Sequence, residues 1–141
     1  MLVCGQNKRR IIHLILYIIF LFATSMVPMD QRVEGFRFVF AIRPSVQNLL
    51  HIPLFTVLSI LWLRALQSYG RAAWKSVFLT LLLSSFVGVL NEFIQIVVPG
   101  RYPSLGDTIL NVMGSILGIV LYQVIQNEQQ NQRLKRFERM N

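Results

Sequence analysis

Cysteine and acidic residues are scarce in this chain. Its 141 residues include one cysteine, Cys4, so an intramolecular disulfide is excluded and no cysteine-based metal site is expected. Charged residues make up only 14% of the chain, against about 25% in an average soluble domain. Hydrophobic residues make up 54%, and the mean hydropathy is +0.53. The sequence also has no internal repeat and no long linker, and its composition does not describe a soluble domain.

The shortage of acidic residues leaves a strongly basic chain. Six Asp and Glu stand against fourteen Lys and Arg, which gives a formal net charge of +8. Such a charge could indicate a nucleic-acid partner, but the basic residues lie beside the apolar runs rather than in a separate domain. They are better explained as orientation and lipid-headgroup signals. We therefore expect membrane lipids as partners and no nucleic acid, and we leave open whether the chain forms a homo-oligomer.

Four apolar runs of bilayer-spanning length account for this composition. They are expected at about residues 11–27, 49–66, 77–98 and 108–125, followed by a polar, basic tail at 126–141. The sequence therefore predicts one domain over residues 1–141, an all-α integral membrane four-helix bundle. Because Lys8-Arg9-Arg10 precede the first run, a cleaved signal peptide is the alternative there. The run is long for a signal peptide and no clear cleavage site follows it, which favours a membrane anchor.

The distribution of Lys and Arg predicts the orientation of the spans. Ten of them fall on the side that holds both chain ends: Lys8, Arg9, Arg10, Arg64, Arg71, Lys75, Arg133, Lys135, Arg136 and Arg139. Four fall on the opposite side: Arg32, Arg37, Arg43 and Arg101. Because basic residues accumulate in cytoplasmic loops, we expect both termini in the cytoplasm.

The longest connection, residues 30–48, alternates with a period of two. Phe36, Phe38 and Phe40 alternate with Arg37, Val39 and Ala41. One interpretation places this segment at the outer membrane interface, with phenylalanines toward lipid and arginines toward phosphates. An ordinary amphipathic loop explains the pattern equally well, and both interpretations stay open.

Polar side chains interrupt the two apolar runs between Gly88 and Gly118. Such groups are costly in apolar helices and usually face protein or a water-filled cavity. At 3.6 residues per turn, the polar and small residues of the third span share one face of the helix, and those residues of the fourth span form one stripe. The third-span set is Ser85, Gly88, Glu92 and Gln95; the fourth-span set is Asp107, Asn111, Gly114 and Gly118. The glycines are predicted to pack helices, because small residues let backbones approach closely in a bilayer.

A short polar turn separates these two stripes. Pro99-Gly100 is expected to end the third helix, because proline lacks a backbone donor and glycine tolerates positive φ. Ser104-x-x-Asp107 is typical of a helix N-terminus, where the carboxylate is also favoured by the helix dipole. The two stripes should therefore face each other beneath the turn, with Arg101 above them.

These residues resemble the signature of the VanZ-like family of bacterial membrane proteins. The resemblance rests on Glu92-x-x-Gln95, Pro99-Gly100-Arg101, Ser104, Asp107, Asn111, Gly114 and Gly118. The segment from Asn48 to Leu54, with His51 and Pro53, is similar to the family's second-helix entry, although Gln47-Asn48 stands where other members have an Asp-Lys pair. The family is named for a protein that raises tolerance to teicoplanin. Membership would imply a multi-pass location in the bacterial cytoplasmic membrane and a glycopeptide-tolerance phenotype. It would also add lipid-linked envelope molecules to the expected partners.

Four interpretations of the polar residues compete. The first is a non-enzymatic site for an envelope lipid or amphiphile, built from Arg101, Gln95, Ser104 and Asn111. We favour it because no nucleophile and base lie at recognisable spacing. The second is an intramembrane enzyme with Glu92 or Asp107 as acid or base, His51 as partner and Arg101 on the developing anion. A transporter is the third; four short helices without a repeat give it little room for alternating access.

The fourth interpretation is structural. Glu92 and Arg101 would form an ion pair, Asp107 would cap a helix, and Gln95 and Asn111 would join helices. His51, Glu92 and Asp107 could hold a metal ion, but their spacing fits no known metal signature. The sequence alone therefore predicts neither a metal nor another cofactor.

Overall fold

The described part of the chain is entirely helical. The computed structural model describes residues 2–28, 48–67, 73–101 and 104–140. Within them the helices are α1 (Leu2–Ser25), α4 (His51–Gln67), α5 (Ala73–Gln95) and α6 (Leu105–Glu138). The prediction of an all-α fold is confirmed for these residues. The connection predicted at 30–48 lies, except for Asn48, outside the described residues.

Each predicted span coincides with one helix, and two of the four helices are long and apolar enough to cross a membrane. These are α5, with 23 residues, and α6, with 34. At about 1.5 Å per residue, α5 is about 35 Å long, which exceeds a hydrocarbon core of about 30 Å. Helix α4 is apolar but has only 17 residues, and α1 carries Lys8, Arg9 and Arg10 inside the helix.

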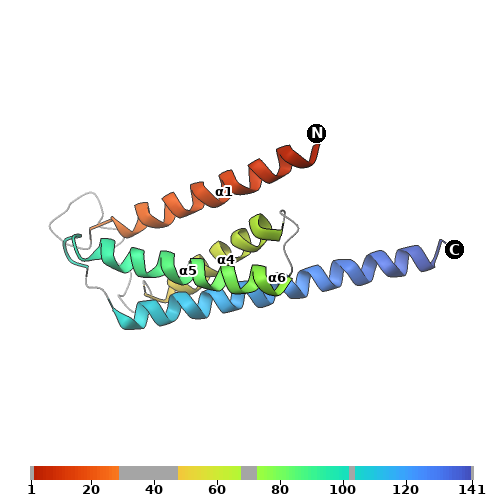
Figure 1. Cartoon of the computed structure of the whole chain (residues 1–141). Helices are drawn as coiled ribbons and strands as arrows, with labels where there is room; N and C mark the ends of the chain where they lie inside the picture. Colours follow the sequence, from red (N-terminus) through yellow and green to blue (C-terminus); the bar gives the residue numbers. More distant parts are fainter. Residues whose placement is uncertain (1, 29–47, 68–72, 102–103, 141) are drawn as a thin grey trace.

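The last helix extends well beyond the predicted fourth span. Residues 126–138, expected to be part of a tail, continue α6 without a break and project past the bundle (Figure 1). Glutamine, glutamate, lysine and arginine dominate this stretch, and these residues favour helix even where nothing packs against them. All side chains from 123 to 140 are exposed. Both ends of the chain lie toward the same end of the bundle (Figure 1).

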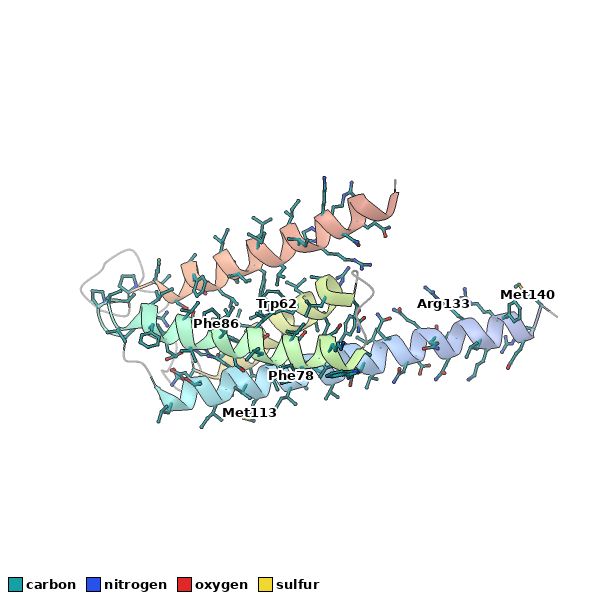
Figure 2. The ribbon with its side chains drawn as sticks, viewed as in Figure 1. Trp62, Phe78, Phe86, Met113, Arg133 and Met140 are labelled. Carbon is teal, nitrogen blue, oxygen red and sulfur yellow. The ribbon has the colours of Figure 1, made fainter. Side chains whose placement is uncertain are left out.

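The distribution of polar and apolar side chains is the reverse of that in a soluble protein. Among the described residues, twelve polar or charged side chains are buried, compared with nine apolar ones. Large apolar side chains cover the outside; Phe78 is 63% exposed, and Phe86 and Met113 also point outward (Figure 2). A continuous exposed apolar surface of this kind marks contact with a membrane or another protein. The outer surface of α5 and α6 therefore suits lipid.

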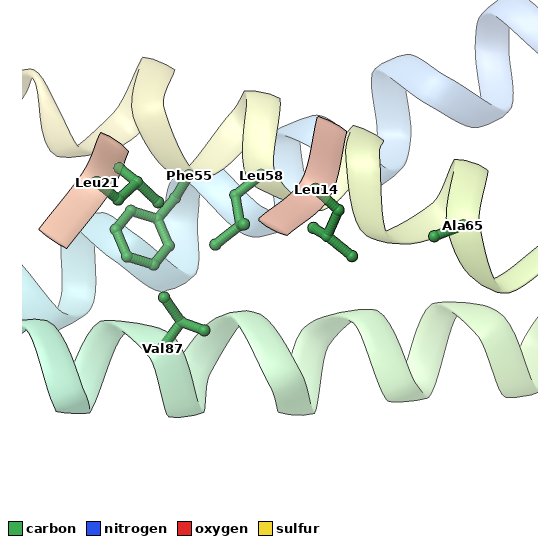
Figure 3. Close-up of a cluster of buried hydrophobic side chains, with 6 residues drawn as sticks. All are labelled: Leu14, Leu21, Phe55, Leu58, Ala65 and Val87. Carbon is green, nitrogen blue, oxygen red and sulfur yellow. The ribbon is translucent and has the colours of Figure 1, made fainter. Parts of the chain in front are cut away.

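The apolar core joins α1 to the rest of the bundle. Leu14 and Leu21 of α1 meet Phe55 and Leu58 of α4, and Val87 of α5 closes the cluster from the opposite side (Figure 3). The Tyr17 hydroxyl donates to the Leu54 carbonyl over 2.9 Å and fixes α1 against α4.

Helices α4 and α6 form the tightest contact in the bundle. A Cβ atom on Gly114 would collide with the Ile52 carbonyl oxygen, and one on Gly118 would collide with the Thr56 carbonyl oxygen. The Thr56 hydroxyl also donates across the contact to the Gly114 carbonyl over 3.0 Å. Two glycines one turn apart thus place the α6 backbone directly against α4. Because His51 begins α4, this contact also determines how far His51 lies from α6.

Candidate functional site

The polar side chains gather where α4 begins, α5 ends and α6 begins. We call five of them the polar cluster: His51, Glu92, Gln95, Asp107 and Asn111. Glu92 and Gln95 occupy the last turn of α5, Asp107 and Asn111 the first two turns of α6, and His51 the first residue of α4. Four of the five are buried and His51 is half-buried.

Two predicted features of the segment between α5 and α6 are present in its described residues. Helix α5 ends at Gln95, before Pro99, and Gly100 adopts a φ of 78° that other residues rarely adopt. Ser104 is the N-cap of α6, and its hydroxyl accepts from the Gly106 amide over 3.1 Å. The prediction that Ser104 caps α6 is therefore confirmed. The Ser104 backbone amide also donates to Glu92 Oε2 over 3.2 Å, and this hydrogen bond connects the start of α6 to the last turn of α5.

His51, Glu92 and Asp107 converge at this end of the bundle. One nitrogen or oxygen atom of each lies within 4.8 Å of the corresponding atoms of the other two. Glu92 is only 7% exposed and Asp107 only 5%. Two carboxylates and an imidazole are therefore close together in a largely desolvated part of the protein.

Asn111 orients the His51 ring. His51 Nδ1 lies 2.8 Å from Asn111 Oδ1, and since an amide oxygen can only accept, Nδ1 carries the proton in this arrangement. In the neutral imidazole the lone pair is then on the other ring nitrogen, Nε2. Gly88 leaves the space for this arrangement, because a Cβ there would lie 3.1 Å from Asn111 Nδ2.

Several buried polar atoms of the cluster have no hydrogen-bond partner within the described ranges. They are Glu92 Oε1, Gln95 Nε2, Asp107 Oδ1 and Asn111 Nδ2. Buried polar groups are hydrogen-bonded in the great majority of cases, so each exception needs an explanation. Four of the seven such atoms among the described residues lie at this end of the bundle, which indicates a site for a polar or charged ligand, or for water.

Arg101 contacts α1. Its Nε donates to the Val27 carbonyl over 3.1 Å and its Nη2 to the Thr24 carbonyl over 3.2 Å, so it caps the C-terminal end of α1. Partial burial lowers the pKa of Arg101, and the nearby charges of Glu92 and Asp107 oppose that shift. The guanidinium therefore remains a cation beside the cluster. The sequence-based interpretations had Arg101 contact Glu92 or a ligand headgroup, and neither of these two hydrogen bonds is such a contact.

The contribution of α1 to this end of the bundle was not anticipated from the sequence. Besides the carbonyls that accept from Arg101, Ser25 donates its hydroxyl to Asn91 Oδ1 over 2.5 Å. In the sequence, the only indication of this contact is a serine near the end of an apolar run, which does not identify a partner on another helix. Buried hydroxyls on α5, at Ser76, Thr80 and Ser84, were also missed, although their four-residue spacing continues the polar face of that helix toward its other end.

Comparison with known proteins identifies the family. The sequence model of VanZ/LLP1 matches residues 10–126 and covers the whole polar cluster. The chain belongs to the VanZ/LLP1 family. The resemblance expected from the polar residues is thereby confirmed, and the family is membrane-associated. No curated protein and no solved structure was found to be similar to the chain.

Proposed function

We propose that this VanZ-like protein crosses the bacterial cytoplasmic membrane four times with both termini in the cytoplasm. In this proposal the polar cluster opens toward the outer face and binds a lipid-linked or amphiphilic envelope molecule. Binding would contribute to tolerance of glycopeptide antibiotics of the teicoplanin type.

The observation that carries the binding proposal is the set of four buried polar atoms, without partners among the described residues, at one end of a bundle with an apolar outer surface. A carboxylate oxygen can accept from a hydroxyl or ammonium group, and an amide nitrogen can donate to a phosphate or carbonyl oxygen. An amphiphile would place its polar part among these groups and its acyl part along the exposed apolar surface of α5 and α6.

The charge distribution supports the orientation. The ten basic residues on the side of the chain ends favour the cytoplasm for that side. The polar cluster lies at the opposite end of the bundle from the N-terminus of α1 and the C-terminus of α6 (Figure 1). Arg101 adds a half-buried cation at the cluster, where the negative headgroup of a lipid would be stabilised.

Antibiotic tolerance tests the binding proposal. A sensitive bacterial host expressing the chain should tolerate more teicoplanin than the host alone. Asn111→Leu, which keeps the number and branching of the side-chain heavy atoms but removes the amide, should lower that tolerance at an unchanged membrane level. Leu16→Ala, on the exposed face of α1 and away from the surface of α5 and α6, is the control and should keep it. Full tolerance in Asn111→Leu would contradict the proposed binding site.

An intramembrane enzyme is the second candidate, favoured by the convergence of His51, Glu92 and Asp107. A carboxylate could take a proton from water or a substrate hydroxyl, and the adjacent imidazole could return it. Glu92→Gln and Asp107→Asn should then abolish tolerance at every expression level. A site that only binds would lose affinity instead, and higher expression would partly restore tolerance.

A further inference from the structure

We propose that His51, Glu92 and Asp107 bind a divalent transition-metal ion, with Zn²⁺ as the expected occupant. This inference goes beyond the proposed function, because a metal could bind these residues whichever envelope molecule the protein recognises. It also departs from the sequence-based expectation of no metal, which relied on spacing along the chain. The three residues come from three helices, so their spacing in the sequence carries no such signature.

The type of ligand atoms fits this class of metal. One imidazole nitrogen and two carboxylates form a mixed nitrogen and oxygen set, which suits Zn²⁺ or Mn²⁺, whereas Mg²⁺ and Ca²⁺ prefer oxygen alone. Three protein ligands also leave at least one coordination position open, as in catalytic zinc sites. An incoming phosphate or water could occupy that position.

The geometry requires only a small adjustment. The three atoms lie within 4.8 Å of one another. Ligands about 2.1 Å from a tetrahedral Zn²⁺ lie about 3.4 Å apart, so the side chains must approach by at most about 1.4 Å. Rotation about the side-chain bonds of Glu92 and Asp107 can supply that movement, because one oxygen of each has no partner to lose in the described residues.

The hydrogen bond between His51 and Asn111 prepares the imidazole for a metal. Metal-binding histidines usually donate their second ring N–H to an oxygen, which fixes the tautomer and the orientation of the ring. Here Nδ1 lies 2.8 Å from Asn111 Oδ1, so Nε2 is the nitrogen that keeps a lone pair. Asn111 is therefore a positioning residue for the proposed ligand.

Charge balance provides an independent argument. Two buried carboxylates this close repel each other unless a cation or a shared proton compensates them. Arg101 is close enough for its charge to act on both carboxylates, but its Nε and Nη2 donate to the carbonyls of Val27 and Thr24, and a single cation does not balance two carboxylates. A divalent ion between Glu92 and Asp107 would neutralise both charges and bind the oxygens that lack partners.

Metal binding by the full-length protein tests the proposal directly. The chain purified in detergent and treated with a chelator should bind one Zn²⁺ per chain, measured by calorimetry and by metal analysis after gel filtration. His51→Ala removes a ligand and should weaken Zn²⁺ binding by more than about 100-fold. Asn111→Leu removes only a supporting hydrogen bond to a ligand and should weaken Zn²⁺ binding by about 10–100-fold. His13→Ala, at the exposed histidine of α1, and Glu128→Gln, on the projecting end of α6, are matched controls and should bind as the wild type does.

Further measurements keep the test decisive if a variant fails to fold. X-ray absorption at the zinc edge of the loaded wild-type protein should show scattering from one imidazole ring and a shell of oxygen atoms near 2 Å. Absence of saturable binding, an oxygen-only shell or equal binding by His51→Ala and His13→Ala would overturn the proposal. A shared proton would then explain the close carboxylates. Because metal binding is measured without antibiotic, its failure would leave the tolerance assay and the lipid-binding proposal untouched.

Discussion

Replacing Gly118 by alanine tests the tightest contact in the bundle. The new Cβ would collide with the Thr56 carbonyl, so α4 and α6 must move apart. Overpacking of this kind costs about 1–3 kcal/mol. The 3.0 Å hydrogen bond from Thr56 to the Gly114 carbonyl would be lost as well, which is worth about 0.6 kcal/mol in membrane helices. The better helix propensity of alanine returns up to about 1 kcal/mol, so the net loss should be about 1–3 kcal/mol.

Unfolding in mixed detergent micelles measures this loss. Gly118→Ala should unfold at a lower mole fraction of sodium dodecyl sulfate than the wild type, followed by helical circular dichroism. Gly106→Ala is the matched control in the same helix, because Gly106 is exposed and its Cβ would approach only the Ser104 hydroxyl, at 3.2 Å. Its stability should be unchanged or slightly raised. If Gly118→Ala unfolds together with Gly106→Ala, the α4 and α6 backbones are not as close as described.

Three further predictions concern the turn and the orientation. Arg101→Ala should lower stability by about 1.5–3 kcal/mol in the same unfolding assay, because the carbonyls of Val27 and Thr24 lose a charged donor; an unchanged transition would show that Arg101 does not hold α1. Ser104→Ala should cost about 1 kcal/mol by removing the N-cap of α6, and Ser104→Asp should restore it. In a Cys4→Ser background, Pro99→Cys should react from outside the cell with a membrane-impermeant thiol reagent, whereas Asn131→Cys should not; the reverse labelling would invert the topology.

The helices were largely predictable because their signals are local. Apolar length located each helix, Pro99-Gly100 ended α5, and Ser104 began α6. The boundary at about residue 125 is a prediction of where the apolar span ends, and it does not give the end of the helix. Helix α6 continues to Glu138 in exposed polar residues that hydropathy does not register.

The site was only partly predictable because its contacts are between helices. The stripes correctly grouped Glu92 with Gln95 and Asp107 with Asn111, since residues on one face follow from helical spacing. Which side chains pair across helices depends on the rotation of each helix about its axis and on the distance between the helices. The spacing of residues along the sequence gives neither. The pairing of His51 with Asn111 and the capping of α1 by Arg101 are of this kind.

Native mass spectrometry of the purified protein tests the lipid-binding claim most directly. Wild-type chain extracted from bacterial membranes in mild detergent should retain one phosphate-bearing lipid or lipid-linked molecule per chain. Asn111→Leu should lose that molecule, and Leu16→Ala, changed only on the exposed face of α1, should retain it. Equal lipid retention in the two variants would show that the polar cluster does not bind the lipid.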